Sequence, residues 1–166
     1  MIERLVIQHD PRRGRVPLGN EPQVVAIHES AHAVIARVLG RPVLRVAPHL
    51  TTYGVQPRTA RGFYRAALIT LSGPAAEDRF CCYTRDQRAE LWCGPVWQTD
   101  LLNAMHHLDA SGGGAMLPVK REAERLVREH WDAIERVAVA LIERGELSGD
   151  RVDALLARPS RPLRCR

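Results

Sequence analysis

The sequence predicts a mainly α-helical domain of the α+β class with a small β-hairpin. Apolar residues recur at helical spacing along most of the chain, whereas residues 43–56 change to a pattern of β-forming residues. A length of 166 residues suits one compact domain, and an apolar content of 45% is enough for a core. Because only 5% of the residues are aromatic, we expect that core to consist mostly of Val, Leu, Ile and Ala.

The N-terminal part is expected to contain a short strand, a basic segment and the first helix. The strand runs from Leu5 to Ile7, and Pro, Arg and Gly dominate the segment after it. Asn20 can cap the helix, Pro22 fits its first turn, and Gln23 falls at the capping-box position. Apolar residues then continue at helical spacing through Val24, Val25, Ala31, Ile35, Val38 and Leu39.

The middle of the chain alternates between strand and helix signals. Residues 43–56 are interpreted as an antiparallel hairpin whose strands are joined by a polar connection from Pro48 to Thr52. Helical spacing returns from Phe63 to Leu71. The Ser72-Gly73-Pro74 sequence is expected to end that helix, and another runs from Ala75 to Cys81.

Three further helices are expected toward the C-terminus. Trp97 to Leu108 forms the first, and the glycine-rich sequence from Ser111 to Gly114 breaks the chain after it. Val119 to Arg144 has the periodicity of one long amphipathic helix, and a short helix from Asp150 to Ala157 follows Gly145.

These elements divide the chain into three parts of one compact domain. Residues 1–20 form the N-terminal strand and basic segment. Residues 21–110 carry the metal-binding motif described below, and residues 115–166 form a C-terminal helical part that is expected to pack against them. The glycines after Ser111 mark the boundary between the last two parts.

Charge and cysteine usage narrow the classes of function. The formal net charge is +5, but the arginines are scattered rather than clustered, which argues against a nucleic-acid-binding surface. No apolar run is long enough to span a membrane, and the N-terminus lacks the features of a secretory signal. None of the four cysteines forms a C-x-x-C pair. We therefore expect a cytoplasmic protein with reduced thiols, and the sequence leaves homo-oligomerisation open.

The sequence His28-Glu29-Ser30-Ala31-His32 matches the H-E-x-x-H pattern of zinc peptidases. Residues four apart on a helix differ by about 40° in direction, so both imidazoles can face one metal ion. Glu29 lies at the edge of the same face, where it can reach a metal-bound water without being a ligand. Such a water has a pKa near 7, so a carboxylate can take its proton while the resulting hydroxide attacks a carbonyl.

The motif leaves the third protein ligand of a catalytic zinc undetermined. No histidine lies within ten residues after His32, so the candidates are Glu77, Asp100, His106 and His107. His107 also follows Asp100 by seven residues, near the same helix face, which makes it a candidate to support a ligand. The alternative for the motif is a pair of hydrogen-bonded core histidines, which would be costly to bury without partners.

Four stretches, taken in order, resemble the peptidase domain of the FtsH family of membrane-bound, ATP-dependent zinc proteases. Ala26–Val34 is similar to the zinc helix of that family, and Pro42–Pro48 to the hairpin that follows it. Leu71–Glu77 resembles its Gly-Gly-x-Ala-Ala-Glu segment. Thr99-Asp100-Leu101 resembles the Asn-Asp-Leu that supplies an aspartate ligand, and the likeness covers roughly residues 24–157.

This resemblance implies a zincin-like helical metallopeptidase domain with one Zn²⁺ ion. It makes Asp100 the third ligand beside His28 and His32, Glu29 the catalytic base, and Glu77 a supporting residue near the metal. The chain has no phosphate-binding loop of the G-x-x-x-x-G-K type, so we expect hydrolysis that is independent of ATP in itself.

The expected function is therefore a zinc metalloendopeptidase that cleaves unfolded or flexible peptide segments. Two alternatives stay open. One is a protease subunit that works with a separate ATPase or adaptor. The other is a catalytically silent, zinc-bound binding module, against which the presence of Glu29 argues, because a purely structural site needs no general base.

Overall fold

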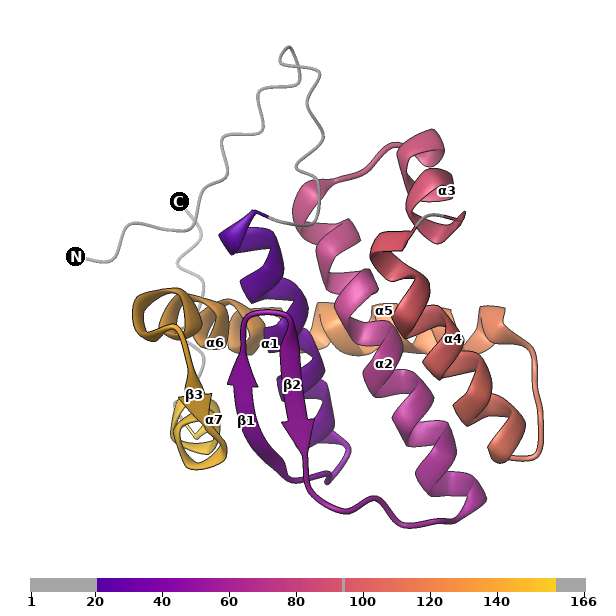
Figure 1. The fold of residues 1–166 in the computed structure, drawn as a ribbon, viewed down its shortest axis with the longest axis horizontal. Helices are drawn as coiled ribbons and strands as arrows, with labels where there is room; N and C mark the ends of the chain where they lie inside the picture. The colour runs from indigo at the N-terminus through magenta and orange to yellow at the C-terminus, as the bar shows by residue number, and fades with distance from the viewer. Residues whose placement is uncertain (1–20, 94, 158–166) are drawn as a thin grey trace.

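The computed structural model describes residues 21–93 and 95–157, and this part of the chain is mainly helical with one small sheet (Figure 1). The expected fold class is confirmed. The expected strand from Leu5 to Ile7 lies outside the described residues. In chain order the elements are α1 (Pro22–Val38), β1 (Val43–Ala47), β2 (Leu50–Tyr53), α2 (Ala60–Cys81), α3 (Arg85–Cys93), α4 (Pro95–Ala110), α5 (Met116–Glu129), α6 (Trp131–Arg144), β3 (Leu147–Ser148) and α7 (Gly149–Leu156).

Helix α1 is the central element, and it is buried on nearly every side from Val24 to Ala36. It lies between α2 and α6 (Figure 1). The predicted Asn20 cap and capping box are wrong. The cap residue is Glu21, whose carbonyl accepts the first helical bond from Val25 at 3.0 Å. The helix begins at Pro22, whose missing N–H costs nothing in the first turn. Gln23 is therefore the second helical residue, whereas a capping box needs Gln or Glu at the third.

The hairpin is tighter than the predicted one. Only Pro48 and His49 lie between β1 and β2, so Leu50 to Thr52 belong to a strand and not to the connection. His49 adopts a left-handed φ of 62° at the second central position of the turn, directly after Pro48, which is the combination that a type II turn uses. A strand that was not predicted, β3, pairs with the other side of β1, where Val46 lies opposite Leu147. The strand order is therefore β2-β1-β3, with β2 at an edge.

Helix α2 is continuous, so the predicted break at Ser72-Gly73-Pro74 is wrong. Thr59 caps the helix by accepting a hydrogen bond from the Gly62 amide at 3.1 Å, and Pro74 lies inside it. A proline costs a helix one hydrogen bond and a local distortion, which tertiary packing can offset. Here Gly73 and Pro74 are buried in the middle of the long α2, and α1 and α4 pack against that helix.

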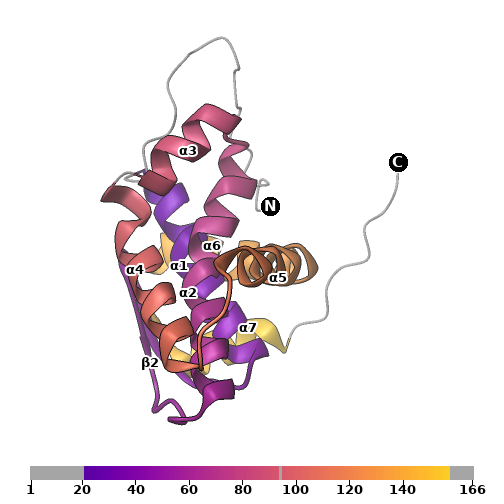
Figure 2. The ribbon, with the colours of Figure 1, turned by 90° about the vertical axis from the view of Figure 1, so that its right-hand side faces the viewer.

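The predicted single helix from Val119 to Arg144 is also wrong, because the chain bends at His130. The backbone of His130 leaves helical geometry (φ −108°, ψ 18°), and its carbonyl accepts the first bonds of α6. The two helices have different partners, since α6 packs on α1 (Figure 1) and α5 packs on α2 (Figure 2). Apolar periodicity continues across the bend and could not reveal it.

Of the remaining helices, α4 and α7 agree with the predictions and α3 is an additional one. Helix α4 contains the predicted helix from Trp97 to Leu108, and three glycines with positive φ separate it from α5. Helix α7 agrees with the prediction to within about a residue, whereas α3 was not predicted. One apolar cluster joins α1, α2, the sheet and α4 to α7. Among the described residues, no helix is both long and apolar enough to cross a membrane.

The pairing of β3 with β1 predicts a marked loss of stability when Leu147 is truncated. Its side chain is 2% exposed, whereas Leu102 on α4 is 57% exposed. Leu147→Ala should lower the free energy of unfolding by about 2–5 kcal/mol, because it removes buried methyl groups and leaves a cavity. Leu102→Ala is the matched control and should change it by about 0.5 kcal/mol or less. Urea denaturation measures both, and equal losses would contradict this packing.

Candidate metal centre

The two motif histidines lie side by side on α1, at the face that meets α2 and α4. Their ring centroids are 4.8 Å apart, and the rings meet edge to face at 80°. His32 is buried, and the side chain of His28 is 15% exposed. The four-residue spacing therefore places both imidazoles at one point, as helix geometry requires.

Asp100 on α4 completes a group of three potential ligands. Its Oδ2 lies 3.0 Å from Nε2 of His28, and its Oδ1 lies 3.7 Å from Nε2 of His32. One ligand atom from each residue falls within 4.8 Å of the other two. Because α4 begins at Pro95, Asp100 lies in the second turn and contacts α1 across the helix interface, well past the first turn of its own helix. The group could hold a metal ion.

The outer nitrogen of each ring is held by α2. Nδ1 of His28 lies 3.0 Å from Oε2 of Glu77, and Nδ1 of His32 donates to the Ile69 carbonyl at 2.8 Å. Histidines that bind metals usually donate their second nitrogen to a carboxylate or a backbone carbonyl, which orients the ring. Both rings therefore have the partners that turn Nε2 toward Asp100.

The carboxylates of Asp100 and Glu77 make the surroundings of His28 favourable for positive charge. Burial alone lowers the pKa of His28, but the hydrogen bonds to Asp100 and Glu77 outweigh it and raise that pKa to about 10. Burial raises the pKa of Asp100, and the neighbouring His32 and His28 more than reverse this and hold it well below its usual range. Asp100 is therefore a carboxylate, the form in which it can bind a cation.

Glu77 is only 2% exposed, and two donors besides His28 hold its carboxyl group. The Tyr83 hydroxyl donates to Oε1 at 2.9 Å, and the Trp97 indole N–H donates to Oε2 at 2.9 Å. A buried carboxyl group without hydrogen-bond partners would be costly, and these donors supply the partners.

Gly73 on α2 leaves the space in front of the two histidines open. A Cβ at this position would stand 2.5 Å from Nε2 of His28 and 2.5 Å from Nε2 of His32. Only glycine fits without displacing both rings. Two ligands about 2.0–2.2 Å from a tetrahedral metal lie roughly 3.3–3.6 Å apart, and the distances from Asp100, 3.0 and 3.7 Å, bracket that range. The residues present therefore fit a small divalent ion with two nitrogen ligands and one oxygen ligand.

The hairpin contributes polar groups beside the motif helix. The Thr51 hydroxyl on β2 lies 2.7 Å from Oε2 of Glu29 and 3.2 Å from the Glu29 carbonyl. Glu29 is 8% exposed, so this contact holds one of its few orientations. Burial raises the pKa of Tyr53, and the nearby carboxylates of Glu29 and Asp100 raise it further, so its hydroxyl keeps its proton.

His106 and His107, the other candidates for the third ligand, lie elsewhere on α4. The ring of His107 stacks on Phe63 at 6.3 Å and lies 5.9 Å from the ring of His106. Within residues 21–93 and 95–157, no hydrogen bond or ring contact joins His107 to the His28, His32 and Asp100 group. Burial lowers the pKa of His107, and the charges of His106 and Arg41 lower it further.

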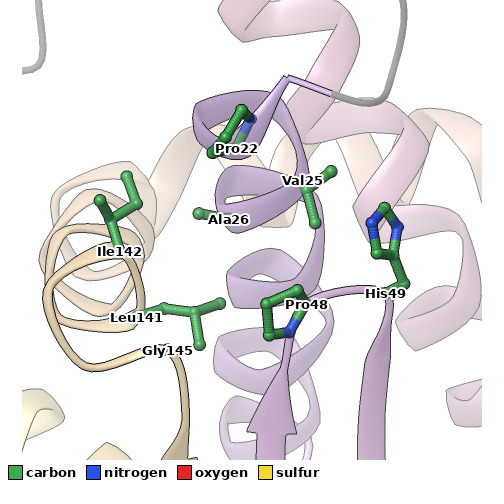
Figure 3. Close-up of a pocket in the computed structure, with 8 residues that line it drawn as sticks. All are labelled: Pro22, Val25, Ala26, Pro48, His49, Leu141, Ile142 and Gly145. Atoms are coloured by element: carbon green, nitrogen blue, oxygen red, sulfur yellow. The ribbon is translucent and has the colours of Figure 1, made fainter.

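An apolar pocket of about 240 Å³ lies between the N-terminal end of α1, the hairpin turn and the C-terminal end of α6 (Figure 3). Pro22, Pro48 and Leu141 are among its lining residues, and none of the potential ligands lines it. The chemistry of this site therefore does not depend on that pocket.

Sequence comparison adds no relative for this chain. No protein-family model matches it, and no curated protein is significantly similar. The fold and the site define it as a mainly helical domain with a candidate metal centre of two histidines and one aspartate.

Several residues of the centre carry no signal that a sequence pattern could have revealed. The sequence pattern predicts that Gly73 breaks a helix, whereas in the structure it makes room for two imidazoles. Thr51 falls within the predicted connection, and tertiary packing alone brings Tyr83 and Trp97 into contact with Glu77.

Gly73→Ala tests the site geometry, because helix propensity predicts a gain in stability whereas the site geometry predicts a loss of metal affinity. Inside a helix this change normally stabilises by about 1 kcal/mol. Here the new Cβ displaces both Nε2 atoms, so the affinity for Zn²⁺ or Co²⁺ should fall at least about tenfold. Competition with a chromophoric chelator measures the affinity, and circular dichroism checks the fold. Unchanged affinity in a folded variant would rule out a metal between these two rings.

Proposed function

We propose that this protein is a zinc-dependent metalloendopeptidase that cleaves unfolded or flexible protein segments. The observation that carries the proposal is the convergence of His28, His32 and Asp100, with Glu29 next to the first histidine. Two imidazoles and one carboxylate leave a coordination position open, which distinguishes catalytic from structural zinc sites. Nitrogen and carboxylate donors together, with no thiolate among them, also suit zinc.

Each residue of the centre then has a defined task. When bound, zinc supplies a Lewis acid that acidifies a water molecule and polarises a carbonyl group. The carboxylate of Glu29 accepts a proton from the attacking water and passes it to the leaving amine. Thr51 holds that carboxylate by a hydrogen bond. The protonated hydroxyl of Tyr53 is a candidate donor to the oxygen that gains negative charge.

The sheet supports an extended peptide as the substrate. Strand β2 pairs with β1 on one side, and among the described residues no strand pairs with its other side. Thr51, which contacts the proposed base, lies on this edge strand. A peptide that added to the edge would be aligned by backbone hydrogen bonds beside Glu29. Only a segment free of its own secondary structure can bind in this way.

This function agrees with the resemblance to the peptidase domain of the FtsH family, and we propose that relationship on the order of the four motifs. The contacts of His28 with Asp100 and Glu77, each at 3.0 Å, support this proposal. We further propose that cleavage needs no ATP and takes place in the cytoplasm. A separate ATPase or adaptor, or self-association, would extend the range of substrates and would leave the site as it is.

Glu29→Gln is the experiment that tests the proposed chemistry. The side chain is nearly isosteric, but an amide cannot accept a proton, so peptide hydrolysis should fall by about 10²–10⁴-fold while zinc stays bound. Glu21→Gln, at an exposed glutamate about two turns earlier, should leave the rate unchanged. A quenched-fluorescence peptide assay without ATP measures the rate, and zinc analysis of the same samples shows retention of the metal.

A chelator should abolish the native activity, and added Zn²⁺ should restore it. Equal rates of hydrolysis by Glu29→Gln and the native protein would contradict the assignment of Glu29 as the general base. If the native protein holds zinc yet cleaves no peptide in a library, alone or with cell extract and ATP, the silent binding module becomes the better account.

A further inference from the structure

Trp97 links the residue behind His28 to the helix that carries Asp100. It lies on α4 one turn before Asp100 and is fully buried. Its indole N–H donates to Oε2 of Glu77 at 2.9 Å. The same oxygen lies 3.0 Å from Nδ1 of His28. One carboxylate oxygen of α2 is therefore shared by side chains of α1 and α4.

We infer that Trp97 is a positioning residue of the metal centre, acting through Glu77 on His28. This inference rests on the proposed metal site but not on peptidase activity. Two donors that meet at one oxygen from different helices restrict the carboxylate to a single orientation. That orientation fixes the plane of the His28 ring. Asp100 lies one turn after Trp97 on the same helix, and its Oδ2 is 3.0 Å from Nε2 of His28.

The second oxygen of Glu77 has a different role. Oε1 accepts from the Tyr83 hydroxyl at 2.9 Å, whereas His28 contacts the other oxygen, Oε2. Tyr83 and Trp97 also pack against each other, with ring centroids 6.1 Å apart. Removing the Tyr83 hydroxyl leaves the oxygen shared by His28 and Trp97 intact. Trp97 should therefore affect metal affinity more than Tyr83 does.

A neighbouring tryptophan gives a matched control. Trp92 belongs to the packing around Trp97, with ring centroids 5.3 Å apart and rings inclined at 76°. Its buried Nε1 has no hydrogen-bond partner in the described part of the chain. The two indoles thus share a cluster and differ in whether the N–H meets Glu77. Replacing each with phenylalanine separates the loss of a donor from the loss of ring volume.

The experiment measures Zn²⁺ affinity by chelator competition in the full chain. Trp97→Phe should weaken binding by about 10–100-fold, the range typical for partners of metal ligands, and Trp92→Phe should change it by less than about threefold. Glu77→Gln should weaken binding to a similar extent as Trp97→Phe. The double variant should lose little more than either single one, because both changes act through the same contact.

A second form of the experiment covers the case in which Trp97→Phe does not fold. Benzothienylalanine, which replaces the indole N–H with sulfur in a ring of nearly the same shape, is introduced at position 97 and, separately, at position 92. The same loss at position 97 alone supports the inference. The Co²⁺ absorption spectrum adds a signature, since a displaced His28 changes the intensity of the d–d bands, whereas a change in stability alone does not.

Equal zinc affinity for the Trp97 and Trp92 variants would overturn the positioning role, and so would losses from Trp97→Phe and Glu77→Gln that simply multiply. Neither result would bear on the proposed peptidase activity. Conversely, the predicted loss of affinity in a protein that cleaves no peptide supports the positioning role and removes the proposed function. If the native chain binds no zinc, both fall together.

Discussion

The contact of His28 with two carboxylates, Glu77 on α2 and Asp100 on α4, is the constraint on which the arrangement of the helices depends. Each carboxylate is at most 20% exposed, and a buried charge is tolerated only where partners surround it. The three helices must therefore meet at one point, with α2 packed between α1 and α4. Trp97 and Tyr83 complete the set of donors to Glu77, so the polar contacts extend into the apolar packing of α3 and α4.

The two sides of α1 have different tasks. On one side, α2 approaches so closely that only Gly73 fits against the imidazoles, and it supplies the carbonyl that orients His32. The hairpin adds an edge strand whose Thr51 holds Glu29. On the other side, α6 and β3 bury the apolar residues of α1 and β1. This packing supports the polar side, as the proposed metal centre requires.

Local patterns in the sequence predict the class of the fold and the residues of the motif, because both follow from the periodicity of a single helix. The predictions were wrong where tertiary contacts override local preference. Pro74 does not end α2, because packing against α1 and α4 offsets the hydrogen bond that the proline removes, and no Gly or Pro marks the interruption at His130. Among the candidates Glu77, Asp100, His106 and His107, only the resemblance singled out Asp100, since 68 residues separate it from His32 and no local spacing links the two. Thr51, Gly73 and Trp97 follow from no pattern, because their roles exist only once three helices and a strand have met.

The central claim is that His28, His32 and Asp100 hold one zinc ion. X-ray absorption at the zinc edge, with metal analysis of the native chain and of Asp100→Ala, tests it most directly. The account predicts one zinc per chain, two imidazole nitrogens and further oxygens at about 2.0–2.2 Å, and a loss of most of the metal in the variant. The chain also contains four cysteines, which would give a zinc–sulfur distance of about 2.3 Å if they were the ligands. A sulfur shell of that kind, or a metal content indifferent to Asp100, would contradict the account.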